Sequence, residues 1–148
     1  MMRVRLADLP DLDEIVAMAK VNSATRPHLT FNETRCRASF VDYLTTASPT
    51  FWVVEDEQGI AGFLVADFYV HRAFDGLFTT QEVLFVKPEK RGTRAATLLM
   101  RQLIEWSKAL GANEIVGGND NDFNSERTAK FLGHFGFKKM GYAMRLEM

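Results

Sequence analysis

The hydrophobic pattern of the first third of the chain predicts a short strand followed by two helices. Residues 4–6 alternate between apolar and polar side chains, as in a strand. From Leu12 to Ala19 apolar residues recur at helical spacing, and the acidic, proline-containing residues 8–11 suit a helix N-terminus. A second helix with one apolar side is expected over Glu33–Thr45.

The middle of the chain is rich in β-forming residues. Runs at 51–55 and 60–70 flank the turn-forming residues 56–59, so we expect them to pair as an antiparallel hairpin. A third run, residues 79–86, ends at Lys87-Pro88, where proline stops strand pairing. The aromatic residues of this region are expected to belong to the core: Phe51, Trp52, Phe63, Phe68, Phe74 and Phe78.

The last third predicts two further helices and two strands. A long helix is expected over residues 95–110, with Gly111 as its C-terminal cap, followed by a short strand at 114–116. A helix over 125–135 and a final strand over 140–148 complete the order β-α-α-β-β-β-α-β-α-β. The expected fold class is α/β, a single domain over residues 1–148 with a central mixed sheet flanked by helices.

Composition and charge narrow the functional classes. The chain has 148 residues, 47% of them hydrophobic, and a net charge of −1, so no long-range field favours nucleic acid or an anionic membrane. No apolar run has the length of a membrane helix, and the N-terminus lacks the apolar core of a signal peptide, so we expect a cytoplasmic protein. The single cysteine, Cys36, excludes an intramolecular disulfide, and with three scattered histidines it disfavours a zinc site.

The segment 86–99 is a candidate anion site, because a strand runs into a helix through a short basic turn. The first N–H groups of such a helix are unpaired and carry partial positive charge, which suits a diphosphate. The small residues Gly92, Ala95 and Ala96 would let a phosphate approach the backbone closely. Formal charge would come from Lys87, Lys90, Arg91 and Arg94.

This segment resembles the phosphate-binding loop of the GNAT superfamily of N-acetyltransferases, whose pattern is Gln/Arg-x-x-Gly-x-Gly/Ala after a strand that ends in Val-x-Pro. The chain matches at Arg91 and Ala96 and departs at Arg94, where the family has glycine. The predicted order of strands and helices also matches the GNAT fold along the whole chain. Residues 124–137 are similar to the family's Asn-x-x-Ala-x-x-Phe-Tyr-x-x-x-Gly-Phe helix, with Phe131, Gly136 and Phe137 aligned.

The resemblance implies acetyl-CoA as co-substrate and direct attack of an amine on its thioester, without a covalent intermediate on Cys36. It places the backbone of the third β-rich run along pantetheine, the amide of Val86 on the thioester carbonyl, and an asparagine of the loop at 119–124 on pantetheine, although turn-forming asparagines are the alternative there. The cofactor-binding residues expected on this basis are Leu84, Phe85, Val86, Arg91, Gly92, Thr93, Arg94, Ala95, Ala96 and Asn124.

A base must take a proton from the acceptor ammonium, whose pKa lies near 10. Glu82 is the first candidate, because a carboxylate inside a central strand is costly unless it serves or is paired; a salt-bridged strand-end residue is the alternative. Asp67, His71 and His28 are weaker candidates. The tyrosine that protonates the CoA thiolate in many relatives falls at Leu132, and Tyr142 in the final strand is the candidate substitute.

The amino-acid sequence does not identify the acceptor amine. The resemblance places it between the loop at 24–32 and the loop at 71–78, where Arg26, His28, Arg72 and Asp75 would contact it. It also leaves a homodimer open, because homodimers are common in the superfamily. Two alternatives remain: a degenerate family member that only binds acyl-CoA, and another nucleotide-binding domain, although the P-loop and dinucleotide glycine spacings are absent.

Overall fold

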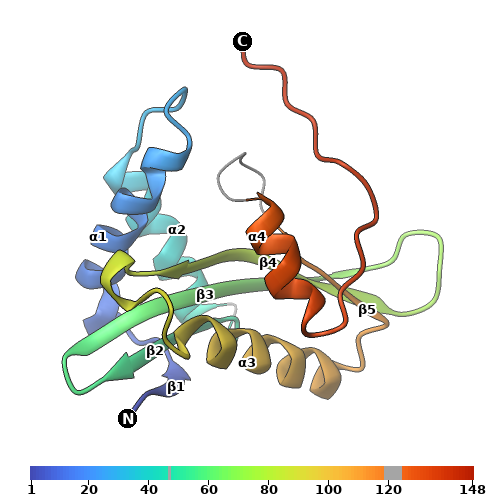
Figure 1. The fold of residues 1–148 in the computed structure, drawn as a ribbon, viewed down its shortest axis with the longest axis horizontal. Helices are drawn as coiled ribbons and strands as arrows, with labels where there is room; N and C mark the ends of the chain where they lie inside the picture. The colour runs from blue at the N-terminus through green and yellow to red at the C-terminus, as the bar shows by residue number, and fades with distance from the viewer. Residues whose placement is uncertain (47, 119–124) are drawn as a thin grey trace.

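The computed structural model, which describes residues 1–46, 48–118 and 125–148, is built on a five-stranded mixed sheet (Figure 1). The strands lie in chain order, and each pairs antiparallel with the next except β4 and β5, which are parallel. The predicted mixed sheet and its hairpin are therefore confirmed. The strands are β1 (Arg3–Leu6), β2 (Phe51–Asp56), β3 (Gly59–Val70), β4 (Leu77–Val86) and β5 (Glu114–Val116).

Helices cover both faces of this sheet. The pair α1 (Leu12–Asn22) and α2 (Glu33–Thr45) packs on one face, and α3 (Ala95–Leu110) with α4 (Ser125–Gly133) packs on the other (Figure 1). Three single-turn 3-10 helices, η1 (Leu9–Asp11), η2 (Ser23–Thr25) and η3 (Pro88–Lys90), occur in the connections. None of the helices described is both long and apolar enough to cross a membrane.

Two separate clusters of buried side chains form the core, one on each face of the sheet. On the α1 and α2 face, the ring of Phe63 lies 5.6 to 5.9 Å from the rings of Phe40, Phe51 and Phe85, measured between centroids. The rings of Phe40 and Phe51 are 5.1 Å apart. On the α3 face, Trp52 of β2 meets Trp106 of α3 edge to face, with ring centroids 5.4 Å apart. Apolar burial on both faces is the main stabilising contribution to this arrangement.

The prediction that all the central aromatic residues are core is only partly correct. Phe51, Trp52 and Phe63 are buried, but Phe68 and Phe74 are largely exposed. Phe68 lies near the end of β3, where one side of its ring meets Trp106 of α3 at a centroid distance of 6.5 Å, and Phe74 lies in the loop after β3.

Local signals set the helix ends where the sequence predicts them. The Oδ1 atom of Asn32 accepts a hydrogen bond from the N–H of Arg35 at 3.0 Å, which caps α2. Gly111 ends α3 in the left-handed region, with φ of 74°. The buried hydroxyls of Thr79 and Ser107, 2.6 Å apart, join β4 to α3.

One ion-pair cluster fastens β1 to its neighbours. The guanidinium of Arg5 donates to both oxygens of Asp11 at 2.8 and 2.9 Å, and it also lies 3.0 Å from the carboxylate of Glu55 in β2. The hydrogen bond from Arg5 holds the pKa of Asp11 below its usual range. The entry to α1 is thereby fixed to the first two strands.

The C-terminus differs from the prediction. Helix α4 ends at Gly133 and not at residue 135, and residues 140–148 form no strand, so the predicted final strand is wrong for the isolated chain. A strand needs a neighbouring backbone to satisfy its hydrogen bonds, and no described strand lies beside this segment. Figure 1 shows it leaving the body after α4 as an extended tail.

Candidate active site

The site is built on the edge of β4 that faces β5. Strand β5 pairs only with Phe78, Thr79 and Thr80, so the rest of this edge has no strand partner in the described chain. The N–H of Lys87 donates to the carbonyl of Ala61 in β3 at 2.9 Å. Because backbone groups alternate sides along a strand, the N–H groups of the two even-numbered residues before it point toward the open edge. These residues are Leu84 and Val86.

Phe85 has a different position from its two neighbours. Its backbone pairs with Phe63 of β3, and its ring is buried in the core under α1 and α2. Of the three predicted cofactor residues in β4, only Leu84 and Val86 therefore present free backbone donors at the open edge.

A β-bulge interrupts β4 next to this edge. Val65 pairs with Val83 and Ala66 pairs with Gln81, so Glu82 is the extra residue. Bulges often re-aim a side chain beside an active site. The carboxylate of Glu82 accepts a hydrogen bond from the Thr80 hydroxyl at 2.5 Å and is exposed. The expectation of a buried carboxylate is thus not met, because β4 is uncovered at this point.

Two tyrosines and a second carboxylate surround Glu82 on the same face. The Tyr43 hydroxyl of α2 donates to Asp67 of β3 at 2.9 Å; burial, and then this hydrogen bond, raise the pKa of Tyr43. The negative charge of Glu82 is the main cause that raises the pKa of Tyr69. Both phenols therefore stay protonated at neutral pH and can donate hydrogen bonds. Among the described residues, no lysine or arginine forms an ion pair with Asp67 or Glu82.

The sequence analysis missed Tyr43, Tyr69 and Thr80. A weak signal was available for two of them, because Tyr69 follows Asp67, and Glu82 follows Thr80, at the two-residue spacing of one strand face. No sequence signal places Tyr43, which depends on how α2 packs on the sheet.

The turn after β4 leads to the start of α3. Gly92 has φ of 83°, a left-handed conformation that favours glycine, and a Cβ atom built there would meet no atom within 4 Å. Arg94 has φ of −77° and ψ of −1°, so the backbone does not require the glycine that the family pattern has at this position. The side chain of Arg94, the N-cap residue, accepts no hydrogen bond from the first turn of α3, and the side chain of Ala95 is fully buried. The N–H of Ala95 donates to the Thr93 hydroxyl at 3.3 Å, and the N–H groups of the next residues face an open turn.

Two of the four predicted phosphate-binding cations have other partners. The ammonium of Lys87 lies 3.0 Å from Glu14 of α1, and that of Lys90 lies 2.7 Å from Asp56 of β2. Arg91 donates from Nε to the carbonyl of Val86 at 3.3 Å, which holds it over the end of β4. The positive charge left for a ligand at this turn therefore comes from Arg91 and the exposed Arg94.

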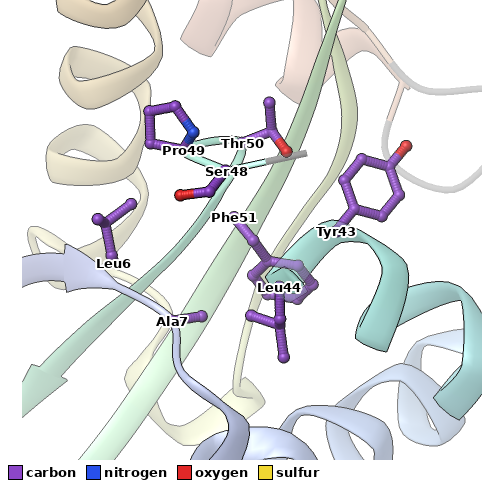
Figure 2. A pocket seen from close by; sticks show the side chains of 8 residues that line it. All are labelled: Leu6, Ala7, Tyr43, Leu44, Ser48, Pro49, Thr50 and Phe51. Atoms are coloured by element: carbon purple, nitrogen blue, oxygen red, sulfur yellow. The ribbon is translucent and has the colours of Figure 1, made fainter. Parts of the chain in front are cut away.

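Two concavities lie away from this turn. Figure 2 shows a small pocket of about 40 Å³ between the end of β1, α2 and the start of β2, well below the size of a ligand site. A wider, open depression of about 530 Å³ lies at the β3–β4 loop and falls in the size range of ligand sites. It is lined by Tyr69, Val70, His71, Arg72, Ala73, Phe74 and Phe78.

The remaining predicted residues lie apart from this site or outside the described chain. Tyr142 is in the exposed tail, where the Lys139 ammonium sits 4.2 Å from its ring centre. Asn124, like the other asparagines of its loop, lies outside the described residues. Leu132 is buried in the core on the α3 face. His28 faces Glu147 of the tail at 3.3 Å, and His71 packs against the ring of Phe78.

Comparison with known proteins is consistent with this geometry. Residues 47–139 match the family model described as an acetyltransferase (GNAT) domain. No curated protein sequence matches the chain significantly.

Solved structures resemble the fold over its whole length at low sequence identity. A transcriptional regulator from Bacillus halodurans C-125 superposes with a TM-score of 0.81 at 18% identity, covering 100% of both chains. A predicted acetyltransferase from Clostridium acetobutylicum, solved with acetyl-CoA, gives 0.76 at 19% identity over 99% of this chain and 96% of its own. An aminoglycoside N-acetyltransferase in complex with CoA gives 0.78 at 16% identity over 100% and 95%.

Proposed function

Because the chain belongs to the family of GNAT acetyltransferase domains, we propose that it transfers the acetyl group of acetyl-CoA to a primary amine. The observation that carries this proposal is the open edge of β4, which runs without a strand partner from Gln81 to Val86 and is followed by a basic turn that leads to the start of α3. Two structural relatives of the same fold were solved with acetyl-CoA or CoA, which supports the choice of donor.

In this proposal CoA binds along β4 as an added strand would. The amide groups of pantetheine pair with the free backbone groups of Leu84, the N–H of Val86 binds the thioester carbonyl, and the diphosphate lies on the N–H groups that follow Ala95 in the first turn of α3. Gly92 gives the open space that the phosphate needs, and Arg91 and Arg94 supply positive charge. Thr93, Ala95 and Ala96 complete the turn. Asn124 stays a prediction.

The acceptor amine attacks the thioester carbonyl from the face that carries Glu82. The bond from nitrogen to the acetyl carbon forms as the bond from carbon to sulfur breaks, and CoA leaves as a thiolate. The N–H of Val86 points to the open edge, where it would stabilise the negative charge that develops on the carbonyl oxygen. Glu82 takes the proton of the ammonium, directly or through a water molecule.

The protonated phenols of Tyr43 and Tyr69 and the carboxylate of Asp67 would position the amine near Glu82. A cationic acceptor suits this face, because the two carboxylates have no lysine or arginine partner in the described chain. Thiolate is a good leaving group, with a thiol pKa of about 8.5, so it can be protonated through water, which takes up the second proton that the nitrogen loses as the amide forms. Tyr142 stays a prediction for that role.

A second candidate function is acyl-CoA binding without turnover. Leu132, buried in the core where the resemblance places a proton-donating tyrosine, is the observation that favours it. The two functions share the CoA site and differ only in the release of free CoA when amines are present.

Titration calorimetry of the purified protein with acetyl-CoA, and separately with CoA, tests the shared site. We expect binding with a Kd of about 1 to 100 μM, within the range of about 1 μM to 1 mM that KM values usually span. The Ala96→Glu variant should bind at least about 100-fold more weakly, because its carboxylate would meet the diphosphate, while a glutamate in the first turn of a helix leaves α3 stable.

The control is Ala109→Glu, which adds the same side chain at an exposed position in the last turn of α3. It should retain acetyl-CoA affinity within about twofold, since the last turn lies a full helix length from the proposed diphosphate. Equal affinity of both variants would contradict the proposed site. If binding is confirmed, release of free thiol with a panel of amines decides between transfer and binding alone.

A further inference from the structure

The open depression of about 530 Å³ at the β3–β4 loop takes no part in the proposed binding of CoA. Its volume lies in the range of small-molecule sites. Figure 1 shows this loop at the end of the sheet that lies away from α1 and α2. Four of the side chains that line the depression carry rings, and we call them the aromatic row: Tyr69, His71, Phe74 and Phe78.

The rings of the aromatic row lie next to one another along the depression. The centroid of the Phe78 ring is 5.5 Å from that of Tyr69 and 5.1 Å from that of His71. The ring of Phe74 follows at 6.2 Å from His71, edge to face. Phe74 is 78% exposed, so most of its surface is free to contact a ligand. The row therefore offers apolar area and the faces of aromatic rings to a flat aromatic group.

The aromatic row begins beside the proposed base. Tyr69 of β3 lies opposite Phe78 of β4, and the next pair on the same face is Asp67 opposite Thr80. The Thr80 hydroxyl donates to the carboxylate of Glu82 at 2.5 Å. The negative charge of Glu82 raises the pKa of Tyr69, as expected for side chains that lie near each other. One face of the hairpin thus leads from two carboxylates to a row of rings.

This arrangement indicates the chemical class of the acceptor. Given the proposed acetyl transfer, on which the inference rests, we infer that the acceptor is a primary amine whose other end carries an aromatic ring. Its ammonium lies near Asp67 and Glu82, and its ring lies on the aromatic row. Positions two residues apart in a strand are separated by about 7 Å, which a short alkyl chain between nitrogen and ring can span. Phe74 and Phe78 are then specificity-determining residues.

The charge of the depression selects against a second ammonium on the acceptor. Arg72 lies in the lining and is positively charged at neutral pH, and no described residue of the lining is acidic. A polyamine would bring its second ammonium toward this guanidinium, where like charges repel. An aromatic ring has no formal charge and can stack on a guanidinium. The depression therefore favours an aromatic group over a cationic one.

Three primary amines test this inference by the release of free thiol at saturating acetyl-CoA. They share a butyl chain, which ends in a phenyl ring in phenylbutylamine, in a methyl group in butylamine and in a second ammonium in putrescine. We expect kcat/KM for phenylbutylamine to exceed that for butylamine at least about tenfold, because the ring removes apolar area from water on the aromatic row. Putrescine should have the lowest value of the three.

Removal of one ring tests the proposed contact. Phe74→Ala, a change at an exposed position, should lower the ratio of kcat/KM for phenylbutylamine to that for butylamine about fivefold. Phe68→Ala is the matched control, because Phe68 is an exposed aromatic residue of the same hairpin whose ring faces Trp106 of α3. It should keep this ratio within about twofold. Circular dichroism verifies that both variants fold.

A charge reversal gives a second test that removes no ring. Arg72→Glu should raise the ratio of kcat/KM for putrescine to that for butylamine about fivefold at low salt, because the second ammonium then meets a carboxylate. The effect should decrease at high salt, since the position is exposed.

Equal kcat/KM values for phenylbutylamine and butylamine, or the highest value for putrescine, would overturn the inference and leave acetyl transfer standing. So would a preference that Phe68→Ala lowers as much as Phe74→Ala does, or a putrescine ratio that Arg72→Glu leaves unchanged. Absence of thiol release with every amine of the wider panel would contradict the proposed transfer itself, and the inference with it.

Discussion

At the scale of single residues, the position of Glu82 depends on one extra residue in β4. Glu82 is itself that extra residue, without a partner in β3, and its carboxylate accepts the hydrogen bond of the Thr80 hydroxyl two residues before it. Regular pairing with β3 resumes at Val83 and continues to Val86, along the segment where the proposed donor binds. The proposed base therefore lies two residues before the first of the proposed donor-binding residues, Leu84.

We predict that Glu82→Gln lowers the rate of acetyl transfer by about 10²-fold or more at neutral pH, because an amide cannot accept the ammonium proton. The loss should narrow toward pH 10, where the free amine is abundant. A pH profile of kcat/KM measures both effects. The control is Glu105→Gln, a substitution at an exposed position of α3, which should keep the wild-type pH profile. If Glu82→Gln also keeps the wild-type pH profile, Glu82 is not the base.

Sequence reasoning found Glu82 by its place in a strand but misjudged its surroundings. The expected cost of a buried charge does not arise, because the Glu82 side chain is exposed on its face of the sheet. Whether another layer covers that position is a tertiary property that the residues of β4 do not encode. The same limit hid Tyr43, whose link to Asp67 depends on the packing of α2.

At the scale of elements, local sequence signals were sufficient to predict where helices and strands begin and end, but not which distant residues their side chains contact. The bounds of α2, α3 and β5 agree with the prediction, because an asparagine cap, a left-handed glycine and short apolar runs act within a few residues. The cations before α3 were all assigned to phosphate, but Lys87 and Lys90 lie against Glu14 and Asp56, which are distant in sequence.

The cluster that joins β1, η1 and β2 makes a prediction about acid stability. Asp11→Asn should destabilise the fold by about 1 to 2 kcal/mol at pH 7, because the charge-assisted bonds from Arg5 are lost. The pKa of Asp11 is lowered in the folded state, so its contribution is present above the unfolded value near 4 and is lost as the pH falls below it.

Urea denaturation of both proteins between pH 7 and pH 3 measures this difference, which should shrink as the wild type loses the same interaction. Asp13→Asn serves as the control, since its pair with Arg37 is at the surface and should contribute less than about 0.5 kcal/mol. A difference that does not change with pH would contradict the assignment to the ionised carboxylate.

At the scale of the whole molecule, the fold class followed from the order of elements, and the final strand did not form. The alternation in the last residues was correctly recognised, but whether an alternating segment becomes a strand depends on a second backbone beside it. The sequence of one chain specifies the pattern of such a strand and leaves the identity of its partner open.

Ligand binding gives a prediction for the entire fold. Acetyl-CoA at about 100 times its Kd should stabilise the native state by about 2.7 kcal/mol, which raises the Tm by roughly 5 to 11 °C for a chain of this size. Differential scanning fluorimetry measures this shift. The Ala96→Glu variant, if it binds about 100-fold more weakly, should gain at most about 0.4 kcal/mol, or about 1 to 2 °C, at the same ligand concentration. A similar shift in both proteins would indicate binding elsewhere.

Because Trp52 and Trp106 pack against each other, the tryptophan fluorescence of the protein reports on only one face of the sheet. These are the only two tryptophans of the chain, and both lie in the core between the sheet and α3. Their emission therefore reports the docking of α3, the helix whose first turn is proposed to hold the diphosphate, and is silent about the phenylalanine-rich core under α1 and α2. If the two layers come apart in separate steps, tryptophan fluorescence will record one step and far-ultraviolet circular dichroism will record both.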